Sequence, residues 1–171
     1  MPNPSGKAVF RSLVFILTQP FLPPMGILPI FIHEASHYFI ALAAGIPSSD
    51  IIFAFIGDNP GVVIPATVSP EFLPYFFYAG GIISGTFLLF IYLFYWIKQS
   101  RLAPSLANWI MGMTTVIAMS LQFYMGILEG MYQQSYGGRI NDIYLVLWVM
   151  IFVVCHAIIF HLVSRRKKTV F

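Results

Sequence analysis

Long runs of apolar residues, separated by short polar stretches, dominate this sequence. Crossing a bilayer takes about 20 residues of helix, so the longer runs are candidates for membrane-spanning helices. They predict four such helices, over residues 25–44, 74–97, 104–128 and 140–163. Gly45 and Pro47 follow the first run and are typical of a helix end.

The chain before the first of these helices follows a different pattern. Residues 8–18 form an apolar run that is too short to cross a membrane alone. No small-x-small cleavage site follows this run, so we expect residues 1–24 to be a retained N-terminal half-helix or leader. Residues 164–171 form a basic tail. The sequence thus predicts one multi-pass transmembrane domain over residues 1–171, with its helical core over residues 25–163.

The segment between the first two predicted helices has the pattern of a β-hairpin. Residues 51–56 are β-branched or aromatic, residues 57–61 form a Gly-Asp-Asn-Pro-Gly turn cluster, and residues 62–64 are again β-branched. We therefore expect an all-α membrane protein with about four transmembrane helices and a short β-hairpin-like insertion after the first helix.

Composition agrees with a membrane protein and excludes an ordinary soluble domain. Hydrophobic residues make up 58% of the chain and charged residues only 9%, whereas a soluble domain carries about 25% charged residues. The formal net charge is +3, but the basic residues cluster at the ends of apolar runs instead of forming a nucleic-acid-binding face. The expected surroundings are a lipid bilayer, with no nucleic-acid partner.

The basic residues also predict an orientation. If the chain starts in the cytoplasm and four helices alternate in direction, Arg139 is the one basic residue on the outer side. The cytoplasmic side then receives Lys7, Arg11, Lys98, Arg101, Arg165, Arg166, Lys167 and Lys168. Because cytoplasmic loops carry an excess of lysine and arginine, we expect an integral multi-pass membrane protein with a cytoplasmic C-terminus.

The first predicted helix carries three ionisable residues, His33, Glu34 and His37. Such groups are costly at membrane depth and usually functional. Residues four apart share one helical face, so both imidazoles can bind a single metal ion. Glu34 projects about 100° around the helix, where it can take a proton from metal-bound water. Paired histidines with a carboxylate suit Zn²⁺, so the expected cofactor is zinc.

Catalytic zinc normally takes three protein ligands, so the pattern requires one more. Glu129, at the end of the third predicted helix, and Asp142, about one turn into the fourth, lie on the same outer side as His37. Asp142 is the predicted third metal ligand, and Glu129 is the alternative. Two other histidines, His156 and His161, lie far from this end of the fourth helix and are not expected to be ligands.

The motif His33-Glu34-Ala35-Ser36-His37, with Ala41 and Gly45 downstream, resembles the site-2 protease family of intramembrane zinc metalloproteases, particularly its small M50B-type branch. The hairpin-like segment, the Tyr78-Ala79-Gly80-Gly81 sequence and the later Asn141-Asp142 pair are similar to further elements of that family. The family's Leu-Asp-Gly element is matched only by Leu128-Glu129-Gly130, with glutamate in place of aspartate.

This resemblance implies a zinc metalloendopeptidase that cleaves a transmembrane or membrane-adjacent segment of a membrane-anchored substrate. Glu34 would be the catalytic base, and His33, His37 and Asp142 would hold zinc. Two alternatives stay open from the residues alone. The first is a non-proteolytic metal-binding membrane protein that acts as a structural or partner-binding module. The second, less favoured, is a metal transporter, since its route to the cytoplasmic face would need more polar residues.

Overall fold

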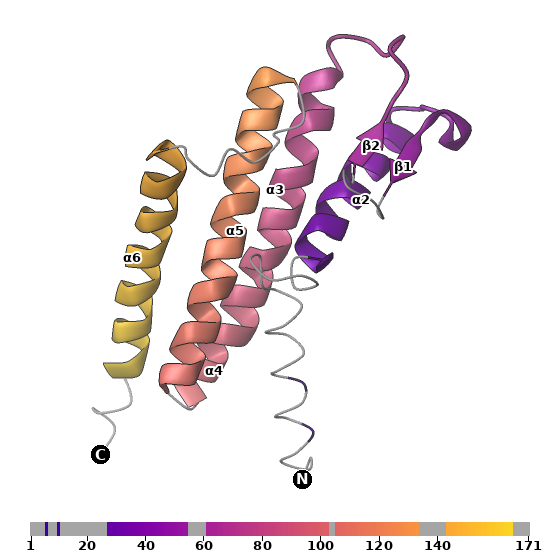
Figure 1. Ribbon diagram of the computed structural model, residues 1–171. Helices are drawn as coiled ribbons and strands as arrows, with labels where there is room; N and C mark the ends of the chain where they lie inside the picture. The colour runs from indigo at the N-terminus through magenta and orange to yellow at the C-terminus, as the bar shows by residue number, and fades with distance from the viewer. Residues whose placement is uncertain are drawn as a thin grey trace.

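The computed structural model describes residues 6, 10, 27–54, 61–102, 105–133 and 143–165. The described chain is mostly helical, with one small antiparallel sheet (Figure 1). Its helices are α2 (Ile27–Ala43), α3 (Leu73–Ile91), the π-helix η2 (Tyr92–Trp96), α4 (Ile97–Leu102), α5 (Leu106–Tyr132) and α6 (Ile143–Arg165). Because η2 continues α3 directly into α4, these three elements form one long helix. The predicted helical architecture is confirmed for these residues.

The predicted β-hairpin is present as two short strands. A 3₁₀ turn, η1 (Ser48–Asp50), leads into β1 (Ile52–Ala54), which pairs antiparallel with β2 (Gly61–Val63). Phe53 lies opposite Val62 in the register. The turn residues that the sequence singled out lie mostly outside the described residues.

Among the described residues, three helices are long and apolar enough to cross a membrane: Leu73–Leu102, Leu106–Tyr132 and Ile143–Arg165. On α6, large hydrophobic side chains such as Leu147, Ile151 and Ile158 are exposed, as a lipid-facing surface requires. The described part of α2 has 17 residues, which span about 25 Å against a hydrocarbon core of about 30 Å. The four-span count stays a prediction for α2.

Helix α2 ends at the glycine that the sequence predicted as a helix end, Gly45. Gly45 adopts a positive φ of 85°, which a residue with a side chain rarely tolerates. The Gly45 N–H donates to the Leu42 carbonyl, and the Ile46 N–H donates to the Ala41 carbonyl. This pattern is the Schellman motif, and it ends α2 just before η1 and the sheet.

The core of the molecule is the packing of α3 between α2 and α5, with α6 on the far side of α5 (Figure 1). The buried side of α5 follows a spacing of three and four residues, as in left-handed helix pairs: Asn108, Gly112, Thr115, Met119, Gln122, Gly126 and Glu129. Most of these residues are small or polar, as expected where membrane helices pack closely. The sheet, the start of α3 and the end of α5 lie at the same end of the bundle (Figure 1).

Some predicted features fall outside the described residues. They include most of the predicted half-helix at residues 8–18, of which residue 10 is described and helical. They also include Asp142, Arg139 and the basic residues 166–168.

Candidate metal centre

Three potential metal ligands meet between α2 and α5. The Nε2 atom of His33 lies 3.0 Å from Oε2 of Glu129, and the Nε2 atom of His37 lies 3.7 Å from the same oxygen. One ligand atom from each residue lies within 4.8 Å of the other two. The three residues are 3%, 5% and 4% exposed. A buried His33–His37–Glu129 cluster of this kind can hold a metal ion.

The separations fit a single zinc ion. Zinc binds imidazole nitrogen and carboxylate oxygen at about 2.0–2.2 Å with tetrahedral angles, which places neighbouring ligand atoms about 3.4 Å apart. Both nitrogen–oxygen distances in the cluster lie close to that value. Little side-chain movement would be needed to bind the ion.

The Nδ1 atoms of both histidines are already engaged, which leaves Nε2 available in each ring. His37 Nδ1 lies 2.7 Å from the backbone carbonyl of Phe76. Since that carbonyl only accepts, Nδ1–H donates to it. His33 Nδ1 lies 2.8 Å from Oε1 of Gln122, an acceptor to which it donates in the tautomer whose Nε2 can bind a metal. Metal-binding histidines typically donate their second N–H to such an acceptor, which fixes ring orientation and tautomer.

Gln122 is itself in contact with Ser84 on α3. The fully buried Ser84 hydroxyl lies 2.7 Å from Oε1 of Gln122 and also 2.7 Å from the Gly80 carbonyl, between which its single hydrogen is shared. A chain of contacts therefore runs from α3 through the α5 amide to the α2 imidazole. Gln122 was not among the site residues predicted from the sequence. Gln122 lies seven residues before Glu129, two helical turns away on the same face, and this spacing was the available signal.

Glycines bring the three helices close enough for this arrangement. A Cβ atom at Gly80 would overlap Nε2 of both His33 and His37, so α3 passes directly against the cluster. Between α3 and α5, a Cβ atom at Gly81 would overlap the backbone of Gly126, and the reverse substitution is also crowded. These glycines thus let α2 and α5 each approach α3 closely, which brings α2 and α5 near each other.

Glu34 lies beside the cluster without joining it. Its side chain is half-buried, and its carboxylate interacts electrostatically with His33, His37 and Glu129. One residue along a helix from His33, it projects to a neighbouring face of α2. This placement is compatible with a base next to a metal-bound water, as the motif predicts.

The structure brings together two of the three ligands predicted from sequence, His33 and His37, with the alternative third residue, Glu129. Asp142 lies outside the described residues, so its assignment as a ligand stays a prediction. His156 lies elsewhere, hydrogen-bonded to Tyr92 and to the backbone of Trp109.

Comparison of the chain with protein-family models, with curated proteins and with solved structures found no match. The resemblance to site-2 proteases therefore rests on the sequence motif.

Proposed function

We propose that this protein is an intramembrane zinc metalloendopeptidase that hydrolyses a peptide bond in a transmembrane or membrane-adjacent segment. The observation that carries the proposal is the convergence of His33 Nε2, His37 Nε2 and Glu129 Oε2, with both Nδ1 atoms held by acceptors. The HExxH pattern adds a carboxylate, Glu34, next to the ligands. Together these residues make up the usual catalytic zinc set of three ligands and a base.

Each residue would have a distinct role in hydrolysis. Bound zinc would lower the pKa of a water molecule and polarise the scissile carbonyl. Glu34 takes a proton from the attacking water as the water oxygen bonds to the carbonyl carbon. Glu34 then returns the proton to the leaving nitrogen as the carbon–nitrogen bond breaks. His33, His37 and Glu129 hold their positions throughout, because Gln122, the Phe76 carbonyl and the packed α3–α5 pair fix them.

A helical substrate has to unwind before its peptide bond can reach this centre, because helical backbone groups are paired internally. The edge of the sheet offers backbone hydrogen-bond donors and acceptors to such an unwound segment. β1 pairs only with β2 among the described strands, and its three residues are exposed. An extended substrate could add to this sheet as a further strand. A strand in that position would keep its backbone hydrogen-bonded near α2.

The experiment that tests the proposal compares Glu34→Gln with the native protein. Purified native protein should contain about one zinc per chain and cleave a membrane-anchored substrate. Glu34→Gln should retain zinc and lose cleavage, because the amide cannot accept the proton. Glu71→Gln is the matched control, since Glu71 is exposed in the loop before α3. Unchanged cleavage by Glu34→Gln would contradict the mechanism.

One observation favours a second candidate, a metal site with a structural role. All three ligand residues are almost completely buried, whereas a catalytic metal needs one position open to water and substrate. Cobalt substitution distinguishes the two functions. Added azide should change the visible absorption of the cobalt protein if a position is open. No change, together with absent cleavage, would support the structural role.

A further inference from the structure

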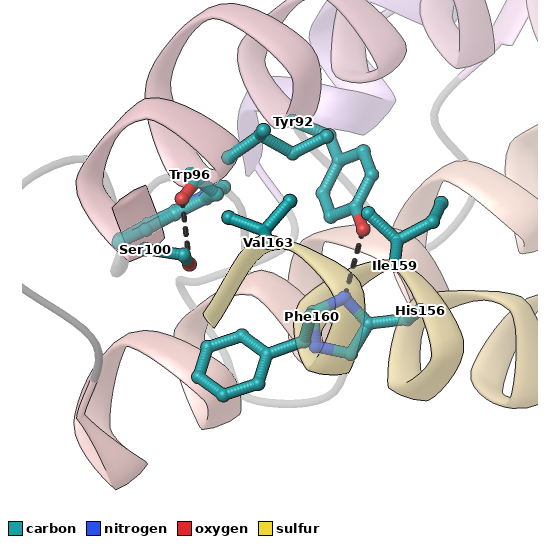
Figure 2. A pocket seen from close by; sticks show the side chains of 8 residues that line it. Tyr92, Trp96, Ser100, His156, Ile159, Phe160 and Val163 are labelled. Carbon is teal, nitrogen blue, oxygen red and sulfur yellow. Dashed lines mark hydrogen bonds between the residues drawn. The ribbon is translucent and has the colours of Figure 1, made fainter. Parts of the chain in front are cut away.

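A largely apolar hollow lies between α2 and β1. Its volume is about 430 Å³, within the range of about 300–1,000 Å³ that is common for ligand sites. The cavity between the long helix and α6, shown in Figure 2, has only about 10 Å³ and is too small for an amino-acid side chain. Four of the described residues that line the α2–β1 hollow are aromatic, and none is charged. The hollow therefore suits an uncharged, apolar group.

The aromatic residues form the walls of the hollow. The ring of Phe53, on β1, packs edge-on against Phe31 and Tyr38 of α2, with centroids 6.4 Å and 5.8 Å away. Tyr38 in turn packs against Phe39 at 5.7 Å. Phe31, Phe39 and Phe53 nevertheless stay 45%, 65% and 37% exposed. Their free faces and edges can receive a further ring, because aromatic pairs attract one another beyond the effect of burying apolar area.

The hollow lies on the side of β1 that faces away from β2. Phe53 and Val62 are cross-strand partners, so their side chains lie on the same face of the sheet. Val62 packs against the buried cluster that includes Ala41 and Phe76, whereas Phe53 lines the hollow and no residue of β2 does. An extended segment that pairs with the outer edge of β1 would therefore place alternate side chains over the hollow.

The hollow and the metal centre lie on different faces of α2. Phe31 and Ala35, which both line the hollow, are four residues apart and share one face. His33 and His37 each follow two residues later and therefore project about 200° around the helix axis, with Glu34 between the two faces. Passing around a helix about 10 Å in diameter takes about three extended residues. A side chain in the hollow would thus belong to a substrate residue about three or more positions from the scissile bond.

We propose that the α2–β1 hollow is a substrate-recognition site that binds an aromatic or large aliphatic side chain at a distance from the scissile bond. This inference rests on the proposed function and names its substrate class, an unwound segment with a bulky apolar residue about three or more positions from the cleaved bond. Ala35 makes room for that side chain, because it is the smallest residue that lines the hollow from α2. The remote contact would hold the unwound segment against β1 while its peptide bond lies at the metal.

Photo-crosslinking to the full chain carrying Glu34→Gln, in detergent micelles, tests the site without requiring hydrolysis. The probe is a synthetic peptide of alternating threonine and valine with one benzoylphenylalanine. Mass spectrometry should find its crosslinks at Phe31, Phe39 or Phe53. The same peptide with phenylalanine at that position should compete at a concentration about 10-fold lower than the peptide with alanine there. Crosslinks elsewhere in the chain, or equal competition by the two peptides, would overturn the proposal.

Ala35→Trp, which fills the hollow, provides a second measurement in the same Glu34→Gln chain. Ala43→Trp is the matched control, because it adds the same bulk at an exposed position of α2 that does not line the hollow. Crosslinking should fall about 10-fold in Ala35→Trp and stay native in Ala43→Trp, with thermal unfolding as the check on the fold. Native crosslinking in Ala35→Trp would overturn the proposal. Absence of cleavage by the native protein would instead contradict the proposed function, since crosslinking does not depend on it.

Discussion

At the scale of single residues, Glu129 completes the buried cluster that could hold a metal ion. Glu129 lies within reach of both histidine nitrogens, yet its side chain is one methylene longer than the aspartate of the family that the motif resembles.

We expect Glu129→Gln to lower zinc affinity strongly, because a neutral amide is a poor zinc ligand. Asp142→Asn, measured in parallel by metal analysis and competition with a chromogenic chelator, should leave affinity near the native value. If Asp142→Asn loses zinc and Glu129→Gln keeps it, the third ligand is the aspartate that the sequence analysis predicted.

The Gln122 amide supports a second residue-scale prediction. Gln122→Leu removes the acceptor of the His33 Nδ1–H, so zinc affinity should fall about 10–100-fold. Chelator competition measures the affinity, and the absorption of the cobalt protein reports the changed ligand field. Gln99→Leu on α4 is the matched control and should keep native affinity. Native affinity in Gln122→Leu would show that the amide does not support the site.

At the scale of elements, much of the helical pattern could be predicted, because apolar run length fixes where a membrane helix can lie. The end of α2 followed from Gly45, and the hairpin followed from β-branched residues around a turn cluster. The π-helix at Tyr92–Trp96 could not be predicted, since no local signal distinguishes it from an α-helix. The sequence named Glu129 as the alternative third ligand but could not choose it over Asp142, because the choice depends on how α2, α3 and α5 rotate about their axes.

The α3–α5 contact offers an element-scale test. Gly126→Val should push α5 away from α3, because a Cβ atom there would crowd the backbone of Gly81. Overpacking of this kind costs about 1–3 kcal/mol of unfolding free energy, and it should also lower zinc affinity by displacing Glu129. Gly61→Ala, at a site with open space, is the control. Thermal unfolding in detergent and metal analysis measure both effects, and unchanged values for Gly126→Val would contradict the role given to the contact.

At the scale of the whole molecule, the charges of the described residues are segregated. Helix α4 and the end of α6 lie at the end of the bundle opposite the sheet (Figure 1), and they carry the described basic residues Lys98, Arg101 and Arg165. Asp50 in η1, Glu71 just before α3 and Glu129 near the end of α5 belong to elements at the sheet end.

Because basic residues favour the cytoplasmic side, we expect the sheet to face outward. Single cysteines at Ser69 and Lys98, introduced after Cys155→Ala, should react with a membrane-impermeant maleimide from opposite sides. Ser69→Cys should be labelled in intact cells and Lys98→Cys only after lysis. The reverse labelling pattern would show that the sheet faces the cytoplasm.

The candidate metal centre joins two parts of the chain that are far apart in sequence. His33 and Glu129 are separated by 96 residues, and α2 lies mainly against α3, with little other contact to α5. A bound ion would therefore act as a cross-link that closes a long loop and restricts the unfolded chain, as a disulfide does. Under a pulling force applied to α2, the metal-loaded protein would resist extraction as one unit with α5, whereas the metal-free protein could release α2 alone.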